Sequence, residues 1–119
     1  MDAPAQTTET PESEKSAPVA LSRDEAFETL SNRRRRYIIH YLRDEDQPVA
    51  LSDLAEQIAA WENDTEILDI SASERKTVYT SLQQFHLPKM DEMGVVEFDR
   101  RAGTVSVTDA TEGLDIYLE

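Results

Sequence analysis

The sequence predicts one α+β domain, mainly α, in which four helices precede a β-hairpin and a short terminal helix. Three observations carry this prediction. The chain has 119 residues, which is room for a single domain. Apolar residues recur with helical spacing as far as Gly94. Beyond Gly94 they alternate with polar residues, as in half-buried strands.

The first twenty residues differ from the rest of the chain, because they hold three prolines and almost no large apolar side chain. Such a segment buries too little surface to offset the conformational entropy that it would lose on folding. We therefore expect a disordered acidic tail over residues 1–20 and an ordered domain over residues 21–119.

Two helices open the domain. Ser22 and Glu25 have the spacing of a capping box, so the first helix should begin there. Residues 31–32 are suited to end it and to start a second helix at about 33–43. Arg35 falls on the apolar stripe of this second helix. We expect its head to snorkel along the edge of the core or to pair with an acid.

The third helix is predicted at about residues 53–62, with Ser52 as its cap. An acidic loop of about residues 62–72 follows, and it is longer than the usual turn between two such helices. An acidic loop would repel phosphate unless it folds away. We expect three apolar residues to anchor it to the domain: Ile67, Leu68 and Ile70.

A fourth helix, at about residues 72–86, should start at a second capping box formed by Ser71 and Glu74. Its apolar stripe, which should face the core, consists of Val78, Leu82 and Phe85. Pro88 lacks a backbone N–H, so we expect it to kink or end this helix.

The hairpin is predicted over about residues 95–108, with a loop at 99–103 that contains a glycine near its end. Arg100 and Arg101 lie in that loop and charge its tip. The last stretch of the chain has the spacing of a short amphipathic helix, with Leu114, Tyr117 and Leu118 on its apolar side.

Four helices followed by a hairpin with a charged tip is the element order of a winged helix-turn-helix domain. In such domains one helix enters the DNA major groove, and the hairpin, called the wing, contacts the backbone nearby. The order alone leaves another small α+β fold open.

Four segments together resemble a known family: LSNRRRRYII at 30–39, AAWEN at 59–63, ERKTVY at 74–79 and HLPKMDEMGVV at 86–96. They are similar to a haloarchaeal winged helix-turn-helix domain family of unknown function, common in predicted transcriptional regulators. The resemblance covers about residues 22–110. It implies a winged-helix fold and a halophilic archaeal source. It implies a role in regulating transcription only by analogy with other proteins of that fold.

The charge balance is strongly acidic, with 25 acids against 12 bases and a net charge of -13. Abundant acids with three lysines against nine arginines are typical of proteins from salt-loving cells, and an ordinary acidic protein is the alternative. The charge is uneven, because residues 30–43 carry five arginines and no acid while residues 44–70 carry nine acids and no base. A polyanionic partner should therefore meet residues 30–43 or 71–108.

The polar face of the fourth helix is the first candidate DNA-binding surface. Its side chains can donate to phosphates or pair with base edges, and they are Ser73, Arg75, Lys76, Tyr79, Thr80 and Gln83. Arg100 and Arg101 at the hairpin tip are suited to the minor groove or to phosphate. A solvated helix face and a merely polar hairpin tip are the alternatives.

The arginine run of the second helix is open to two interpretations. Arg33, Arg34 and Arg36 could contact phosphates, or they could pair with the acids of residues 44–70. We favour the pairing, because those acids need counter-charges and lie close in the sequence.

Several classes of function are not supported. The chain has no cysteine, two histidines and three glycines, so we expect no metal, no cofactor and no glycine-rich phosphate loop. His40 and His86 should be surface or capping residues. No nucleophile motif indicates an enzyme, and no small-molecule ligand is evident. The absence of an apolar membrane span favours a cytoplasmic protein.

The sequence thus predicts a DNA-binding transcriptional regulator that reads double-stranded DNA with the helix at about 72–86 and braces with the wing. We expect a homodimer, since many such regulators match two half-sites. The alternative is a protein-protein interaction module on a winged-helix scaffold without DNA contact.

Overall fold

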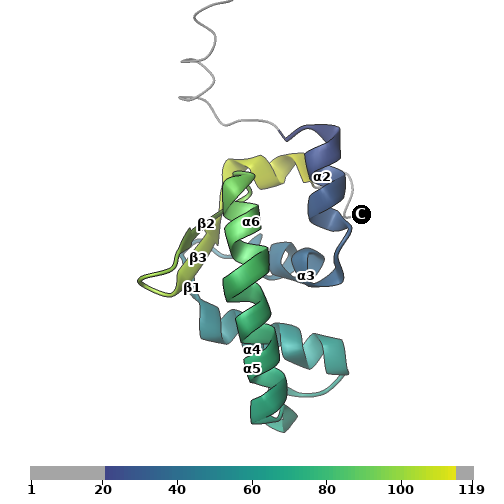
Figure 1. Cartoon of the computed structure of the whole chain (residues 1–119), viewed down its shortest axis with the longest axis vertical. Helices are drawn as coiled ribbons and strands as arrows, with labels where there is room; N and C mark the ends of the chain where they lie inside the picture. The colour runs from purple at the N-terminus through teal and green to yellow at the C-terminus, as the bar shows by residue number, and fades with distance from the viewer. Residues whose placement is uncertain (1–20, 115–119) are drawn as a thin grey trace, which may run out of the picture.

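A computed structural model describes residues 21–114 (Figure 1). The predicted tail over residues 1–20, and Tyr117 and Leu118, lie outside the described residues. The helices and strands follow in this order: α2 (Arg23–Leu30), α3 (Arg33–Leu42), β1 (Val49–Ala50), α4 (Leu51–Asn63), α5 (Ala72–Ser81), α6 (Leu87–Glu92), β2 (Val96–Asp99) and β3 (Thr104–Val107).

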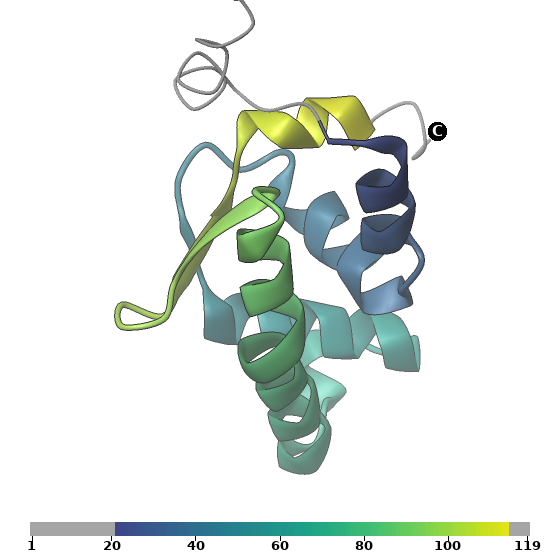
Figure 2. The same ribbon diagram turned by 45° about the horizontal axis from the view of Figure 1, so that its top comes forward.

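The three strands form one antiparallel sheet with the order β1-β3-β2. Helices α2 to α6 lie to one side of it, and the β2–β3 hairpin extends from the body of the molecule (Figures 1 and 2). The predicted fold class, α+β and mainly helical, is confirmed. The arrangement is compatible with that of a winged helix-turn-helix domain.

The predicted helix starts at Ser22, Asn32 and Ser71 are confirmed. The hydroxyl groups of Ser22 and Ser71 each accept a hydrogen bond from the backbone amide three residues on. The glutamate at that position accepts one in return from the backbone amide of the serine, which completes the capping box. Asn32 accepts from the amides of Arg34 and Arg35. Side-chain oxygens at these positions satisfy amides that have no partner within their own helix.

Strand β1 is absent from the sequence-based expectations, and Ser52 is not the cap that we predicted. Helix α4 begins at Leu51 without a side-chain cap. The amide of Leu51 donates instead to the carbonyl of Gly103, at 2.8 Å, because β1 pairs with β3 directly before the helix. The sheet thus supplies an acceptor where a serine would otherwise be needed.

Helices α5 and α6 form one continuous rod through a π-helical turn at Leu82–His86 (Figures 1 and 2). Of the two effects predicted for Pro88, a kink or an end of the fourth helix, the end is wrong. Pro88 stands in the first turn of α6, where its missing N–H is tolerated because the π turn has already changed the hydrogen-bond pattern. The rod stops before Gly94, whose φ of 81° makes it the predicted left-handed stop.

The same π turn corrects the predicted core face. Val78 and Leu82 are buried as expected, but Phe85 is 68% exposed. A π turn holds one residue more than an α-helical turn, so the next buried position moves on to Leu87. Met90 then continues the buried face of α6.

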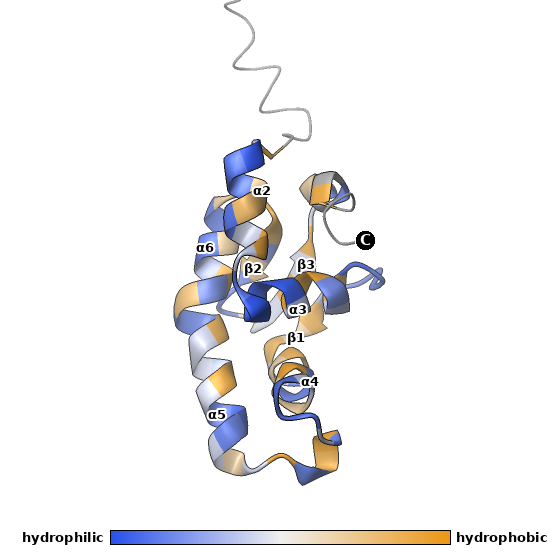
Figure 3. Cartoon of the chain, turned by 90° about the vertical axis from the view of Figure 1, so that its right-hand side faces the viewer, coloured by the Kyte–Doolittle hydropathy of each residue, from blue (hydrophilic) through white to orange (hydrophobic). Residues whose placement is uncertain are grey.

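The acidic loop between α4 and α5 is anchored by one residue and not by three. Ile70 is buried, whereas Ile67 is 37% and Leu68 is 95% exposed. Ile67 and Leu68 belong to a single 3-10 turn, Ile67–Asp69, which lies at the end of the molecule where α5 begins (Figure 3). The predicted anchoring role is therefore wrong for Leu68.

The described residues end in a 3-10 helix, Asp109–Leu114, and Leu114 is fully buried in the core; the rest of the predicted amphipathic helix lies outside the described residues. The core gathers apolar side chains from all the helices and from the sheet. None of the described helices is both long and apolar enough to cross a membrane.

Candidate nucleic-acid interface

The outward face of α5 carries small polar and cationic side chains. Ser73 and Lys76 are exposed, and Thr80 and Gln83 are half-buried. Thr77 and Gln84 are also exposed, and at 100° per residue they fall close to Ser73 and Thr80. Gln84 flanks the face that the sequence indicates, whereas Thr77 was missed, although its spacing from Ser73 indicates it.

This face stands out by its charge within a strongly acidic chain. Residues 75–90 contain no acid, in a protein of 119 residues with 25 acids. Glu74 is the one acid in the first turn of α5, and its carboxylate accepts the amide of Ser71 at 2.9 Å. Within residues 21–114, Lys76 takes part in no ion pair. Glu74 lies about 200° from Lys76 around the helix axis, so a phosphate group that approaches Lys76 comes from the other side of α5.

Arg75 and Tyr79 are less available than the sequence indicates. The Nε of Arg75 lies 3.1 Å from a carboxylate oxygen of Glu56 on α4, and both residues are half-buried. That nitrogen makes no hydrogen bond of regular geometry, so the contact is an ion pair only. Tyr79 packs against the hydrophobic core. Both residues lie on the flank of α5 and connect it to the body of the domain.

The wing brings its two arginines to different positions. Arg101 is exposed at the hairpin tip and forms no ion pair within residues 21–114. Arg100 turns back, and its Nη2 donates to the main-chain carbonyl of Gln83 at 3.2 Å. Its guanidinium also lies 5.9 Å from the centroid of the Phe98 ring. Of the two arginines, only Arg101 has its whole guanidinium available to a partner.

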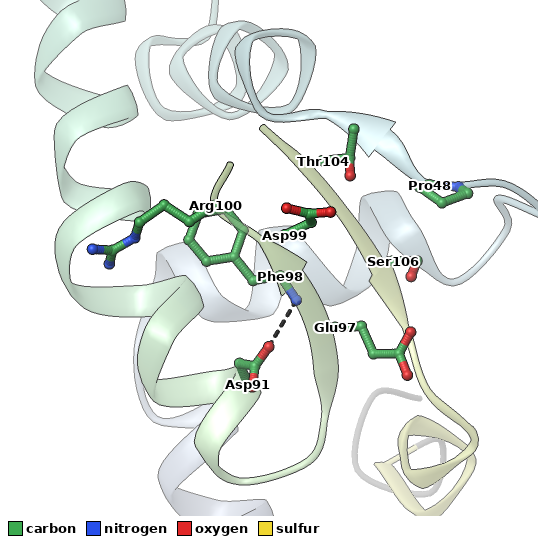
Figure 4. Close-up of a pocket in the computed structure, with 8 residues that line it drawn as sticks. All are labelled: Pro48, Asp91, Glu97, Phe98, Asp99, Arg100, Thr104 and Ser106. Carbon is green, nitrogen blue, oxygen red and sulfur yellow. Dashed lines mark hydrogen bonds between the residues drawn. The ribbon is translucent and has the colours of Figure 1, made fainter. Parts of the chain in front are cut away.

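A shallow groove beside the wing is lined mainly by polar residues: Pro48, Asp91, Glu97, Phe98, Asp99, Arg100, Thr104 and Ser106. Figure 4 shows Phe98 and Arg100 on the side of the long helix, whereas Glu97 and Asp99 lie across β2 from them. Asp91 accepts the amide of Phe98 at 2.8 Å, and Asp99 accepts that of Ala102 at 2.9 Å. These two acids therefore hold the hairpin in shape.

The arginine run of α3 is largely engaged within the domain. Arg34 pairs with Glu62 of α4, with Nη2 at 2.9 Å from Oε1, as predicted. Arg36 donates to the carbonyl of Leu30 at 2.6 Å and not to an acid. The predicted pairing with residues 44–70 thus holds for Arg34 and not for Arg33, which is exposed without an ion pair within residues 21–114, nor for Arg36, to which the end of α2 offers a nearer acceptor.

Arg35 is the most connected residue of that run. It donates to the carbonyls of Glu28 and Thr29, at 2.9 and 3.2 Å, and lies 3.4 Å from Nδ1 of His86. The acceptors are backbone carbonyls and an imidazole, not the acid that the sequence analysis allowed for. Arg35 therefore ties the turn between α2 and α3 to the π turn of the long helix.

His40 is exposed as expected, whereas His86 stands at the N-cap position of α6 but makes no side-chain cap hydrogen bond. His86 is half-buried in the π turn. Burial, together with the positive charges of Arg35 and Arg34, lowers the pKa of His86 from 6.5 to about 4. The imidazole is therefore neutral near pH 7, and its Nδ1 can accept a hydrogen bond from Arg35.

A comparison with protein families gives one match, a domain of unknown function called DUF7344, over residues 27–106. The chain belongs to this family. The DUF7344 match runs from α2 into β3, so it includes the whole long helix and the tip of the wing. No curated protein and no solved structure matches the chain.

The DUF7344 match covers every residue of the predicted site, from Ser73 to Arg101. The structure brings Gln83 and Arg100 into contact, keeps Lys76 and Arg101 exposed, and turns Arg75 and Tyr79 towards the body. Among residues 21–114, no cluster of three or more His, Asp or Glu side chains could hold a metal ion.

Proposed function

We propose that this DUF7344 protein binds double-stranded DNA and regulates transcription. In this proposal the exposed face of α5 enters the major groove, and the wing lies along the adjacent backbone. The observation that carries the proposal is the acid-free run of residues 75–90, which includes the exposed and unpaired Lys76, in a chain with a net charge of -13. A helix face that served only for solubility would not need to be free of acids.

The residues divide into two roles. Lys76 and Arg101 supply positive charge to phosphates or to guanine acceptors. Ser73, Thr77, Thr80 and Gln84 supply hydroxyl and amide groups that can bond to base edges and phosphates. The helix-turn-helix pair consists of α4 and α5, whose packing is fixed at one point by the ion pair of Arg75 and Glu56.

We further infer a halophilic archaeal source and a cytoplasmic location, on the basis of the acidic composition and the scarcity of lysine. In molar salt the release of counterions contributes little to DNA affinity. Affinity would then rest on hydrogen bonds to bases, on packing and on the release of water. A binding face with two unpaired cations suffices under those conditions.

The test is a pull-down of fragmented genomic DNA by the purified protein in molar KCl, followed by sequencing. The wild-type protein should enrich fragments that share a short motif. A motif with two-fold symmetry would support the homodimer that we also propose, since paired half-sites mirror a two-fold protein.

Two double variants make the test specific. Lys76→Glu with Arg101→Glu should abolish the enrichment. Arg23→Glu with Arg33→Glu makes the same charge change at the starts of α2 and α3 and should retain it. Circular dichroism checks that all three proteins are folded. Equal enrichment by both double variants, or none by the wild type, would contradict DNA recognition by α5.

A protein-protein interaction module is the second candidate. The observation that favours it is the exposure of large apolar side chains on the surface, with Leu68 at 95% and Phe85 at 68%. Under this alternative the wild-type protein enriches no DNA although it is folded. Substitution of Leu68 or Phe85, and not of Lys76, would then abolish binding to a partner.

A further inference from the structure

The π turn and Pro88 together take the regular helical amide partner away from the main-chain carbonyl of Gln83. In an α-helix the carbonyl of Gln83 would accept from the amide of Leu87. Here the amide of Leu87 donates to the carbonyl of Leu82, one residue further back. The next candidate donor is Pro88, which has no N–H. Neither the α nor the π pattern can therefore satisfy Gln83.

Arg100 of the wing fills this position. Its Nη2 donates to the Gln83 carbonyl at 3.2 Å, across 17 residues of sequence. The guanidinium is held from the other side by the face of Phe98, 5.9 Å away. Figure 4 shows Arg100 and Phe98 extending together from the end of β2 towards the long helix. This contact joins the wing tip directly to the helix that we propose to bind DNA.

We propose that Arg100 is a positioning residue that clasps the wing to the long helix and thereby presents Arg101 to the DNA backbone. The inference deepens the proposed function and rests on it for its DNA-binding part. It changes the role that the sequence indicates, because Arg100 acts through Arg101 rather than on phosphate itself.

The clasp is testable in the free protein, without DNA. The amides of Ala102 and Gly103 are bonded within the wing, to the side chain and the main chain of Asp99, so their hydrogen exchange reports on wing opening. Arg100→Ala should speed this exchange about fivefold, the scale of one net hydrogen bond. Arg100→Lys should restore part of the protection, and Arg101→Ala should leave it unchanged.

Unchanged exchange of Ala102 and Gly103 in Arg100→Ala would overturn the clasp. Equally fast exchange in Arg101→Ala and Arg100→Ala would overturn it too, because the effect would then not depend on the contact with Gln83.

The DNA-binding part is tested by the salt dependence of affinity for a duplex from the pull-down. Arg101→Ala should reduce the slope of log affinity against log salt by about one. Adding Arg100→Ala to Arg101→Ala should then change neither the slope nor the affinity. A further drop by about one would show that Arg100 contacts phosphate and would overturn its positioning role.

The two proposals fail in different ways. If Arg100→Ala speeds the exchange of the wing amides and Arg101→Ala does not, while the wild-type protein binds no duplex, the clasp is confirmed and the DNA role and the proposed function are overturned. If the wild-type protein binds a duplex but Arg100→Ala leaves the exchange unchanged, the clasp is overturned and the proposed function stays in place.

Discussion

Helices α3 and α5 both carry cations, but they engage different shares of them within the domain. Helix α3 begins with four consecutive arginines, of which Arg34, Arg35 and Arg36 bond to acceptors within the domain. Helix α5 has two cations, and Lys76 stays exposed and without an ion pair within residues 21–114. The number of positive charges is thus a poor guide to a binding face. What matters is which charges the fold leaves unpaired.

The largest effect expected from this contrast is on DNA affinity. Lys76→Glu should weaken binding to a duplex from the pull-down about 100-fold, because it replaces an attractive contact by a repulsive one. Arg33→Glu is the matched reversal on α3 and should change the affinity by less than about threefold. Fluorescence anisotropy titrations in one buffer measure both. The reverse order of effects would place the interface on α3.

The next effect is on stability and concerns Arg35. Arg35→Ala should lower the free energy of unfolding by roughly 2 kcal/mol, because charged hydrogen bonds to the carbonyls of Glu28 and Thr29 are lost. Arg33→Ala, at an exposed neighbouring position, should cost less than about 0.5 kcal/mol. Denaturant unfolding of the two variants measures the difference. Equal stabilities would mean that Arg35 does not tie α3 to its surroundings.

His86 makes the same contact sensitive to acid. Its pKa is lowered to about 4 in the folded protein, so the unfolded state takes up its proton first as the pH falls below 6.5. Stability should therefore decline between about pH 6.5 and pH 4. His86→Gln should lose less stability than the wild type between pH 7 and pH 5. His40→Gln is the matched control. If the free energy of unfolding of His86→Gln declined with falling pH as steeply as that of His40→Gln, this account would be contradicted.

The smallest expected effect concerns the acidic loop before α5. Replacing Asp64, Glu66 and Asp69 by Asn, Gln and Asn removes negative charge close to the start of the proposed reading helix. DNA affinity should rise about threefold at the lowest KCl concentration that keeps the protein folded, and the gain should vanish in molar KCl. A gain that persists in molar KCl would indicate a change of structure instead of electrostatics.

Much of the fold could be predicted because local signals are strong in this chain. The capping boxes at Ser22 and Ser71, the left-handed Gly94 and the alternation in the hairpin each fix a boundary through residues close in sequence. Strand β1 could not be predicted, because two residues are too few to show a period and its partner lies more than fifty residues away.

Three of the corrections, those at Phe85, His86 and Arg100, share one physical cause. The sequence prediction places every residue of the helix at 100° from the one before it, as in a regular α-helix. A single π turn changes the direction in which each side chain after Leu82 points. That turn exposes Phe85, partly buries His86 and frees the carbonyl that draws Arg100 back from the surface. Pro88 is the one local signal of an irregularity, and it indicates the place but not the form that the irregularity takes.

The most direct test of the account is an NMR titration of the protein with a duplex from the pull-down. Binding should shift the resonances of residues 73–84 and of the wing tip at 99–103. The exposed end of α3 around Arg33 should be left unchanged. Shifts confined to α3 or to the exposed Leu68 and Phe85 would contradict the claim that α5 and the wing form the DNA-binding surface.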